Sequence, residues 1–182
     1  YLVISHDHYD HLDYKTVKEL QPKVDKVIIP LGVGAHFEKW NYQPTQLIEE
    51  EWNTTVDLKN NLKITYTPAR HFSGRKFKRN GTLWTSYVLQ TPNQKIFLGG
   101  DSGYDTHFKE IGEQYGPFDF AILENGQYNE AWRYIHALPE DLPVIINELK
   151  AKHVIPVHSG KFALAKHAWD EPLKKIVESG KA

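Results

Sequence analysis

The sequence predicts an α/β fold, and three features of the chain support this class. Strand and helix patterns alternate through its second half, after a middle that is rich in strands. Side chains of the metal-ligand type directly follow several of the strands, where open α/β folds place their ligands. The 182 residues, 40% of them hydrophobic and 13% aromatic, suffice for one well-buried domain. We therefore expect residues 1–182 to form a single domain.

The first elements alternate between short strands and short helices. Residues 1–5 form an apolar run that predicts a strand, and Asp13 can cap a helix over about residues 14–20. A buried strand is expected at residues 26–30 and a short helix at residues 33–40.

The middle of the chain is expected to form a meander of antiparallel hairpins. Its strand patterns are separated by Asn60-Asn61, Asn80-Gly81 and Pro92-Asn93, which favour turns. The expected strands cover residues 46–58, 62–67, 83–90 and 95–98.

The second half is expected to alternate strand and helix. A helix is predicted at about residues 106–115, a strand at 118–123, a helix at 139–151, a strand at 153–156 and a terminal helix from Glu171. The loop at residues 125–138 is rich in aromatic and amide side chains. Its length and composition favour a functional loop.

Charge and cysteine content limit the classes of function. Twenty-two basic and 23 acidic residues give a net charge of −1, so we expect no nucleic-acid partner. No apolar run approaches the roughly 20 residues that span a bilayer, and no signal region opens the sequence, so we expect a cytoplasmic protein. The absence of cysteine excludes disulfides and thiolate metal sites.

The sequence begins at an unusual point relative to its predicted elements. The sequence contains no methionine and begins inside the first predicted strand. We interpret it as an excerpt of a longer protein, in which upstream strands pair with residues 1–5. Without those strands, we expect an exposed sheet edge.

The densest group of metal-ligand side chains follows the first strand. The segment His6-Asp7-His8-Tyr9-Asp10-His11 places three imidazoles and two carboxylates within six residues. Imidazole nitrogen and carboxylate oxygen are zinc ligands, and a solvated polar turn is the alternative interpretation. So many neighbours would crowd one ion. The spacing therefore favours two ions, one shared by His6 and His8 and the other by Asp10 and His11.

Three further candidate ligands end apolar strands in the same way. His71 follows the strand at 62–67, Asp101 follows the strand at 95–98, and His158 follows the last strand. A lone histidine is more often a core or surface residue, but the repeated position favours one shared site. Seven ligands for two ions leave positions open for water.

These motifs resemble those of the metallo-β-lactamase superfamily, whose fold is an αββα sandwich. The similarity extends from residue 1 to about residue 170. Residues 5–13, 68–75, 100–104 and 156–162 resemble the branch that contains N-acylphosphatidylethanolamine phospholipase D. The strands that precede the metal motif in this family are absent from the chain, so the fold is expected to lack its N-terminal strands.

The resemblance implies a ligand set and a reaction. It implies that His6, His8 and His71 bind one zinc ion, that Asp10, His11 and His158 bind the other, and that Asp101 bridges them. The implied activity is a zinc-dependent hydrolase that uses a hydroxide bridging two Zn²⁺ ions. Its substrate would be a phosphodiester such as an N-acylphosphatidylethanolamine-like phospholipid, with peripheral membrane contact.

Other functions remain open. A lactone hydrolase of the same fold is one alternative, and a metal-binding domain without turnover is another. Neutral charge disfavours a nuclease. A di-iron oxygen-utilising member is disfavoured because those enzymes carry a carboxylate where this chain has His8.

Several polar side chains beyond the ligands are candidates for substrate contact or catalysis. Asp101 would orient the nucleophile, with a helix-capping aspartate as the alternative. His136 resembles a similarly placed family histidine and would act as an acid or bind phosphate, with an ordinary loop histidine as the alternative. Arg70, Arg75 and Arg133 could clamp a phosphate, and surface salt bridges are the other interpretation. We interpret the histidines outside this pattern as structural or surface residues; they are His36, His107, His153 and His167.

Overall fold

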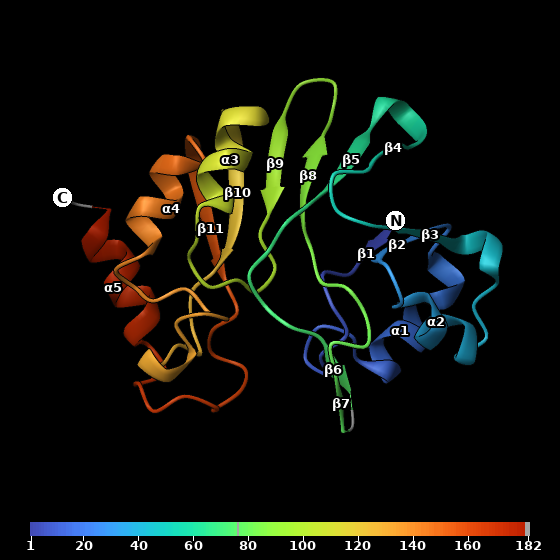
Figure 1. Cartoon of the computed structure of the whole chain (residues 1–182), viewed down its shortest axis with the longest axis horizontal. Coiled ribbons are helices and arrows are strands. Elements are labelled where there is room, and N and C mark those ends of the chain that lie inside the picture. The colour runs from blue at the N-terminus through green and yellow to red at the C-terminus, as the bar shows by residue number, and fades with distance from the viewer. Residues whose placement is uncertain (76, 181–182) are drawn as a thin grey trace.

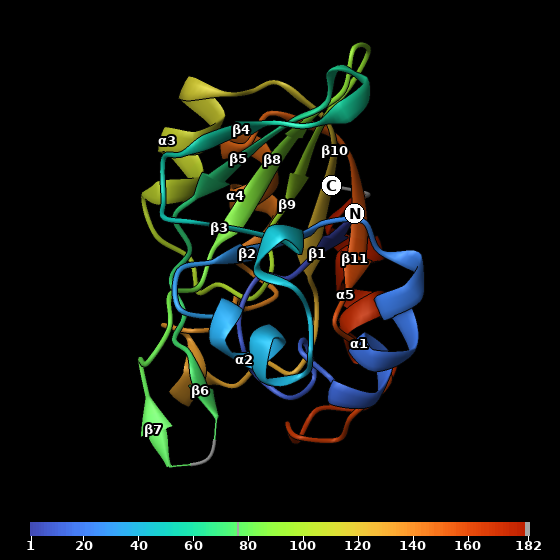
Figure 2. The same cartoon turned by 90° about the vertical axis from the view of Figure 1, so that its right-hand side faces the viewer.

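Two β-sheets pack face to face between two layers of helices (Figures 1 and 2). The computed structural model describes residues 1–75 and 77–180. This αββα arrangement confirms the fold class expected from the sequence. Within the described ranges, no helix is long and apolar enough to cross a bilayer.

The small sheet carries the first metal-ligand motif. It contains three parallel strands in the order β1 (Leu2–Val3), β2 (Val27–Pro30) and β3 (Leu47–Glu50). Helices α1 (Tyr14–Leu20) and α2 (Gly34–Lys39) lie on its outer side (Figure 1). The Asp13 side chain caps α1 by accepting a hydrogen bond from the Thr16 backbone N–H at 2.8 Å, as expected.

The large sheet has six strands in the order β11-β10-β9-β8-β5-β4. Their bounds are β4 (Thr55–Asp57), β5 (Lys63–Thr67), β8 (Ser86–Gln90), β9 (Lys95–Leu98), β10 (Phe118–Glu124) and β11 (Ala151–Val157). Helices α3 (His107–Gln114), α4 (Leu142–Glu148) and α5 (Glu171–Ser179) lie beside β9, β10 and β11 (Figure 1). Strands β9, β10 and β11 are parallel, as alternating strands and helices require. A separate hairpin, β6 (Gly74–Arg75) and β7 (Lys78–Arg79), extends from the lower end in Figure 2.

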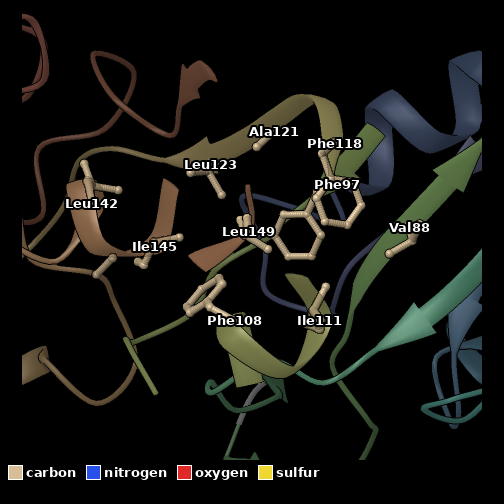
Figure 3. Packing of buried hydrophobic residues seen from close by; sticks show 11 residues of the cluster. Val88, Phe97, Phe108, Ile111, Phe118, Ala121, Leu123, Leu142, Ile145 and Leu149 are labelled. Atoms are coloured by element: carbon tan, nitrogen blue, oxygen red, sulfur yellow. The ribbon is translucent and has the colours of Figure 1, made fainter. Parts of the chain in front are cut away.

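The main core packs helices α3 and α4 against the large sheet. Figure 3 shows Phe97 and Phe118 side by side, with ring centroids 5.6 Å apart, and Phe108 of α3 beside them. Each such side chain contributes about 1.5–3 kcal/mol when it leaves water. This packing fixes strands β9 and β10, whose carboxyl ends carry functional side chains.

A second contact region joins the two sheets. The Tyr87 hydroxyl on β8 donates a hydrogen bond to the Ile4 carbonyl at 2.8 Å, and the Thr85 N–H donates to the Ser5 carbonyl at 2.9 Å. Tyr87 is 1% exposed, so its hydroxyl needs such a partner. These bonds fix the backbone just before the first metal-ligand motif.

Two expectations about the elements are wrong. The strand expected at residues 46–58 is two strands in different sheets, and β3 is parallel to β2, so the antiparallel meander begins only at β4. The chain crosses between the sheets at residues 51–54, where Asn53 has φ 68° and the Trp52 ring N–H donates to the Trp84 carbonyl. The helix expected at 139–151 is shorter, because Lys150 leaves the helical region with φ 54° and β11 begins at Ala151.

Candidate metal centre

The candidate ligands meet at one end of the two sheets. Strands β5, β9, β10 and β11 run in the same direction, because β5 and β9 are both antiparallel to β8. Their carboxyl ends therefore lie at one edge of the large sheet, beside the loop that follows β1. All seven predicted ligands gather there; they are His6, His8, Asp10, His11, His71, Asp101 and His158.

Three imidazoles form the first group. His8 Nδ1 lies 3.0 Å from His6 Nε2 and 3.2 Å from His71 Nε2. Nitrogens that share a tetrahedral zinc at 2.0–2.1 Å would lie about 3.3 Å apart. His71 donates its Nδ1 proton to the Ile135 carbonyl at 2.7 Å, so its Nε2 has a free lone pair. The group fits a single cation bound by three neutral imidazoles.

Two imidazoles and a carboxylate form the second group. His11 Nε2 and His158 Nε2 are 3.3 Å apart, and Asp10 Oδ2 lies 3.3 Å from His158 Nε2 and 3.5 Å from His11 Nε2. Both histidines present the nitrogen that is remote from their backbone. This donor set of two nitrogens and an oxygen also suits zinc.

Asp101 lies between the two groups. Its Oδ2 is 3.2 Å from His11 Nε2 and 3.4 Å from His158 Nε2 in the second group. The same oxygen is 3.9 Å from His71 Nε2 and 4.0 Å from His6 Nε2 in the first. One buried carboxylate oxygen thus faces both groups, as a bridging ligand would.

The electrostatics of the groups differ. Burial lowers the pKa of His6 well below its usual range and lowers the pKa of His71 to about 3, so both imidazoles are neutral near pH 7. Burial also acts on His11, but the carboxylates of Asp10 and Asp101 outweigh it and raise its pKa to about 10. The second group therefore attracts positive charge strongly, whether a proton or a metal ion.

Glu124 is a functional candidate that the sequence analysis missed. It is 5% exposed and ends β10, as the ligands end their strands. Its Oε1 accepts hydrogen bonds from the backbone N–H groups of Ser102 at 2.7 Å and Ala137 at 3.2 Å. Its Oε2 lies 2.7 Å from His136 Nδ1 and 3.8 Å from His158 Nδ1. The strand-end position was the signal in the sequence, but the predicted strand stopped one residue earlier.

His136 lies beside the ligands. Its Nδ1 donates to Glu124, and the same nitrogen is 3.9 Å from Asp101 Oδ2. Burial opposes a charge on His136, but the Glu124 carboxylate outweighs this effect and raises the pKa of the imidazole above its usual value. The structure thus brings this loop histidine into the centre.

A pocket of about 580 Å³ opens over the ligands. Apolar side chains of Phe72, Trp132, Ile135 and Leu164 line it, together with His136 and four of the candidate ligands, His8, Asp10, Asp101 and His158. Apolar walls with a few convergent polar groups are typical of small-molecule sites.

Two of the three predicted substrate-binding arginines lie away from this pocket. The Arg70 guanidinium donates to the Tyr104 carbonyl at 3.0 Å and pairs with Asp105 at 3.2 Å. Arg133 lines a separate surface pocket together with Arg70. Arg70 thus forms a surface salt bridge with Asp105. Arg133 lies in a pocket that none of the candidate ligands line.

The third predicted arginine, Arg75, stabilises the loop between β1 and α1, which carries the first candidate ligands. Arg75 Nη1 donates to the carbonyls of Asp7 and Leu12, each at 2.8 Å, so it holds both ends of the loop that carries the first ligands. Arg79, which the sequence analysis did not select, lines the pocket over the ligands and lies 4.2 Å above the Phe72 ring. Its place in the β6–β7 hairpin could not be inferred because that hairpin was not predicted.

Comparison with known proteins agrees with this geometry. A family model described as a beta-lactamase superfamily domain matches residues 1–159 of the chain. The chain belongs to this superfamily. A curated relative from Pyrobaculum aerophilum is named as a metal-dependent hydrolase and is 23% identical over 179 residues, covering 98% of this chain and 73% of its own. A solved metallo hydrolase from Ignicoccus hospitalis superimposes with a TM-score of 0.74 at 22% identity, covering 99% of this chain and 72% of its own.

Two curated relatives match nearly the whole chain. An uncharacterized protein of Mycobacterium tuberculosis is 42% identical over 180 residues, covering 97% of this chain and 48% of the relative. The N-acyl-phosphatidylethanolamine-hydrolyzing phospholipase D 1 of Caenorhabditis elegans is 31% identical over 196 residues, covering 98% of this chain and 54% of the relative. The chain thus spans about half the length of the curated relatives it matches.

Proposed function

We propose that this superfamily member is a two-zinc phosphodiesterase that acts on an N-acylphosphatidylethanolamine-like phospholipid. The observation that carries the proposal is the bridging position of Asp101, between two groups of three ligands and beneath an apolar pocket. The similarity to the C. elegans phospholipase supports the substrate class. When bound, two metal ions supply a nucleophile from water near neutral pH and stabilise the negative charge of the transition state.

The side chains of the pocket have separate roles in this proposal. Asp101 holds both ligand groups in register, and Glu124 orients His136 by accepting its Nδ1 proton. This hydrogen bond leaves the Nε2 of His136 for a phosphate oxygen or a leaving group in the pocket. Phe72, Trp132 and Ile135 provide apolar contact for an acyl chain.

The function is tested by metal content and substrate choice. We expect about two transition-metal ions per chain, chiefly zinc, by elemental analysis of the gently purified protein. We also expect hydrolysis of bis(p-nitrophenyl) phosphate to exceed hydrolysis of a panel of lactones. A protein without metal would contradict the two-zinc proposal. Faster turnover of a lactone would replace the proposed substrate while leaving the ligand assignment intact.

The two ligand groups are expected to respond differently to pH. The raised pKa of His11, about 10, means that a metal must displace a proton from the second group at neutral pH. Burial opposes a charge on His158 of the same group, but Asp10 and Asp101 outweigh it and raise that pKa too. The zinc affinity of this group should therefore rise at least about ten-fold per pH unit between pH 6 and 8. The first group contains His6 and His71, whose lowered pKa values keep them neutral, so its affinity should stay nearly constant. Competitive zinc titrations at several pH values measure the zinc affinity of each group. An equal dependence of the two affinities on pH would contradict this prediction.

Arg79 is expected to bind the phosphate in place of the predicted arginines. Because it is the arginine that lines the pocket, Arg79→Gln should raise KM for bis(p-nitrophenyl) phosphate by about ten-fold, a typical loss of one charge-assisted contact. Arg133→Gln is the matched control, since Arg133 lines a different pocket. A larger rise in KM for Arg133→Gln than for Arg79→Gln would instead support the role predicted for Arg133.

A further inference from the structure

Large apolar side chains are exposed on two segments that flank the pocket. Phe77, next to β7 in the hairpin, is fully exposed. The loop between β11 and α5 exposes Phe162, Leu164 and Trp169 to 47%, 66% and 76%. Single exposed apolar residues are normal, but a group around one opening indicates a contact surface.

Both segments border the same opening. Arg79 of the hairpin and Leu164 of the loop line the pocket over the ligands, and Phe162 with Lys161 lines an adjoining pocket of about 270 Å³. The hairpin and the loop also both project at the lower end of the molecule in Figures 1 and 2.

Basic side chains alternate with these apolar ones. Lys78 and Arg79 follow Phe77, while Lys161 and Lys166 lie beside Phe162 and Leu164. Residues 77–80 and 160–168 contain no acidic side chain, although the chain as a whole has a net charge of −1. Asp170 and Glu171 follow Trp169 but pair with Lys174 and Lys175 of α5, so the excess positive charge lies at residues 77–80 and 160–168.

The backbone of the loop is anchored, so its apolar side chains are held outward. The buried side chain of Gln127 accepts hydrogen bonds from the N–H groups of Leu164 at 3.1 Å and Ala165 at 2.9 Å, and it donates to the Phe162 carbonyl. The Gln127 N–H donates to His167 Nε2 at 3.1 Å. A loop fixed in this way does not bury its rings by collapse onto the core.

The base of the hairpin is hydrogen-bonded to the loop between β1 and α1. The Gly74 N–H donates to Asp7 Oδ1 at 2.7 Å, and the Asn80 N–H donates to the Ser73 carbonyl at 2.8 Å. The position of Phe77 is thereby tied to the loop that carries His6 and His8.

We propose that the hairpin and the loop form a docking surface for a lipid bilayer that contains anionic phospholipid. Aromatic and leucine side chains enter the boundary between headgroups and acyl chains, while lysines remain at the level of the phosphates. The pocket then opens toward the bilayer. The choice of a bilayer rests on the phospholipid substrate proposed above, whereas the test of docking does not depend on catalysis.

Docking is tested by cosedimentation with vesicles of phosphatidylcholine alone and of phosphatidylcholine mixed with phosphatidylglycerol. We expect binding to the mixed vesicles, weakened by salt. Phe77→Ser with Trp169→Ser should weaken this binding at least ten-fold. Lys78→Gln with Lys166→Gln should weaken it about five-fold for each lysine removed. Val144→Ser on α4 and Lys109→Gln on α3 are matched controls on exposed helix positions and should bind as the unmodified protein does.

The outcomes separate docking from catalysis. Absence of binding to the mixed vesicles, or equal binding by all variants, would overturn the docking proposal. Concentration-dependent self-association that is lost with Phe77→Ser and Trp169→Ser would also overturn it, in favour of a second copy of the chain. Both pairs of substitutions should leave bis(p-nitrophenyl) phosphate hydrolysis unchanged. Vesicle binding without any phosphodiester cleavage would leave docking intact and contradict the proposed function instead.

Discussion

Asp101→Ala is expected to lower kcat/KM for phosphodiesters by at least about a thousand-fold. Among residues 1–75 and 77–180, the change removes the one carboxylate oxygen that lies within 4.0 Å of imidazoles in both ligand groups. Metal ions in such centres contribute several kcal/mol to transition-state stabilisation, and each 1.4 kcal/mol corresponds to a factor of ten in rate. Steady-state kinetics together with elemental analysis measure the effect, and we expect metal content to fall as well.

The fold should survive this change. The main core around Phe97 and Phe118 does not include Asp101, so the circular dichroism spectrum and cooperative unfolding should persist. Asp101→Asn keeps the shape of the side chain and should lose nearly as much activity. Asp57→Ala removes an exposed carboxylate on β4 and is the matched control. Asp101 does not cap α3, whose N-cap residue is Thr106, so retained activity with lowered stability would instead assign Asp101 a purely structural role.

His136→Ala is expected to lower kcat/KM for phosphodiesters by about 10²- to 10⁴-fold while both metal ions stay bound. This range is the usual contribution of a positioned acid or base. His136 Nδ1 lies 3.9 Å from Asp101 Oδ2, and His136 also forms a cluster with Asp101, Glu124 and His158 that could hold an ion. The proposal assigns His136 to neither metal, so retained metal content in the variant tests that assignment. His153→Ala removes an exposed histidine of β11 and should change nothing. Unchanged kinetics of His136→Ala would exclude that residue from the reaction.

Glu124 should act through His136. Replacing Glu124 by glutamine removes the carboxylate that orients the imidazole, with an expected loss of about 10- to 100-fold. If the two residues form one unit, the double variant should lose no more than His136→Ala alone. Additive losses would indicate that Glu124 acts mainly through His158, which its Oε2 approaches to 3.8 Å, and metal content would then fall.

The positions of the ligands could be predicted because their geometry follows from strand direction. His71, Asp101 and His158 each follow a strand of the same sheet, and parallel carboxyl ends meet at one edge. Histidine and aspartate side chains at these positions are of the types that bind zinc. The same rule would have found Glu124 had the predicted strand extended to its last residue.

The arginines could not be predicted in this way. Arg70 and Arg75 are close to His71 in sequence, but a long side chain reaches whichever acceptors the tertiary structure offers. For Arg75 these acceptors are two loop carbonyls, and for Arg70 they belong to Tyr104 and Asp105.

The break in the strand expected at residues 46–58 could not be predicted either, because the local sequence carries no usual turn signal. That segment contains neither glycine nor proline, and Asn53 alone turns the chain between sheets.

Each ligand group draws its donors from both sheets. In the first, His8 in the loop after β1 faces His71 in the loop after β5, 63 positions later in the sequence. In the second, His11 faces His158, 147 positions later. A cation in either group would therefore act as a cross-link that closes a long loop, with stabilisation that depends on free metal concentration. The core around Phe97 needs no such cross-link, since helices and strands of the large sheet alone build it. Chelation should accordingly loosen amide protection at the junction of the sheets first, while the amides of β9 and β10 remain slow to exchange.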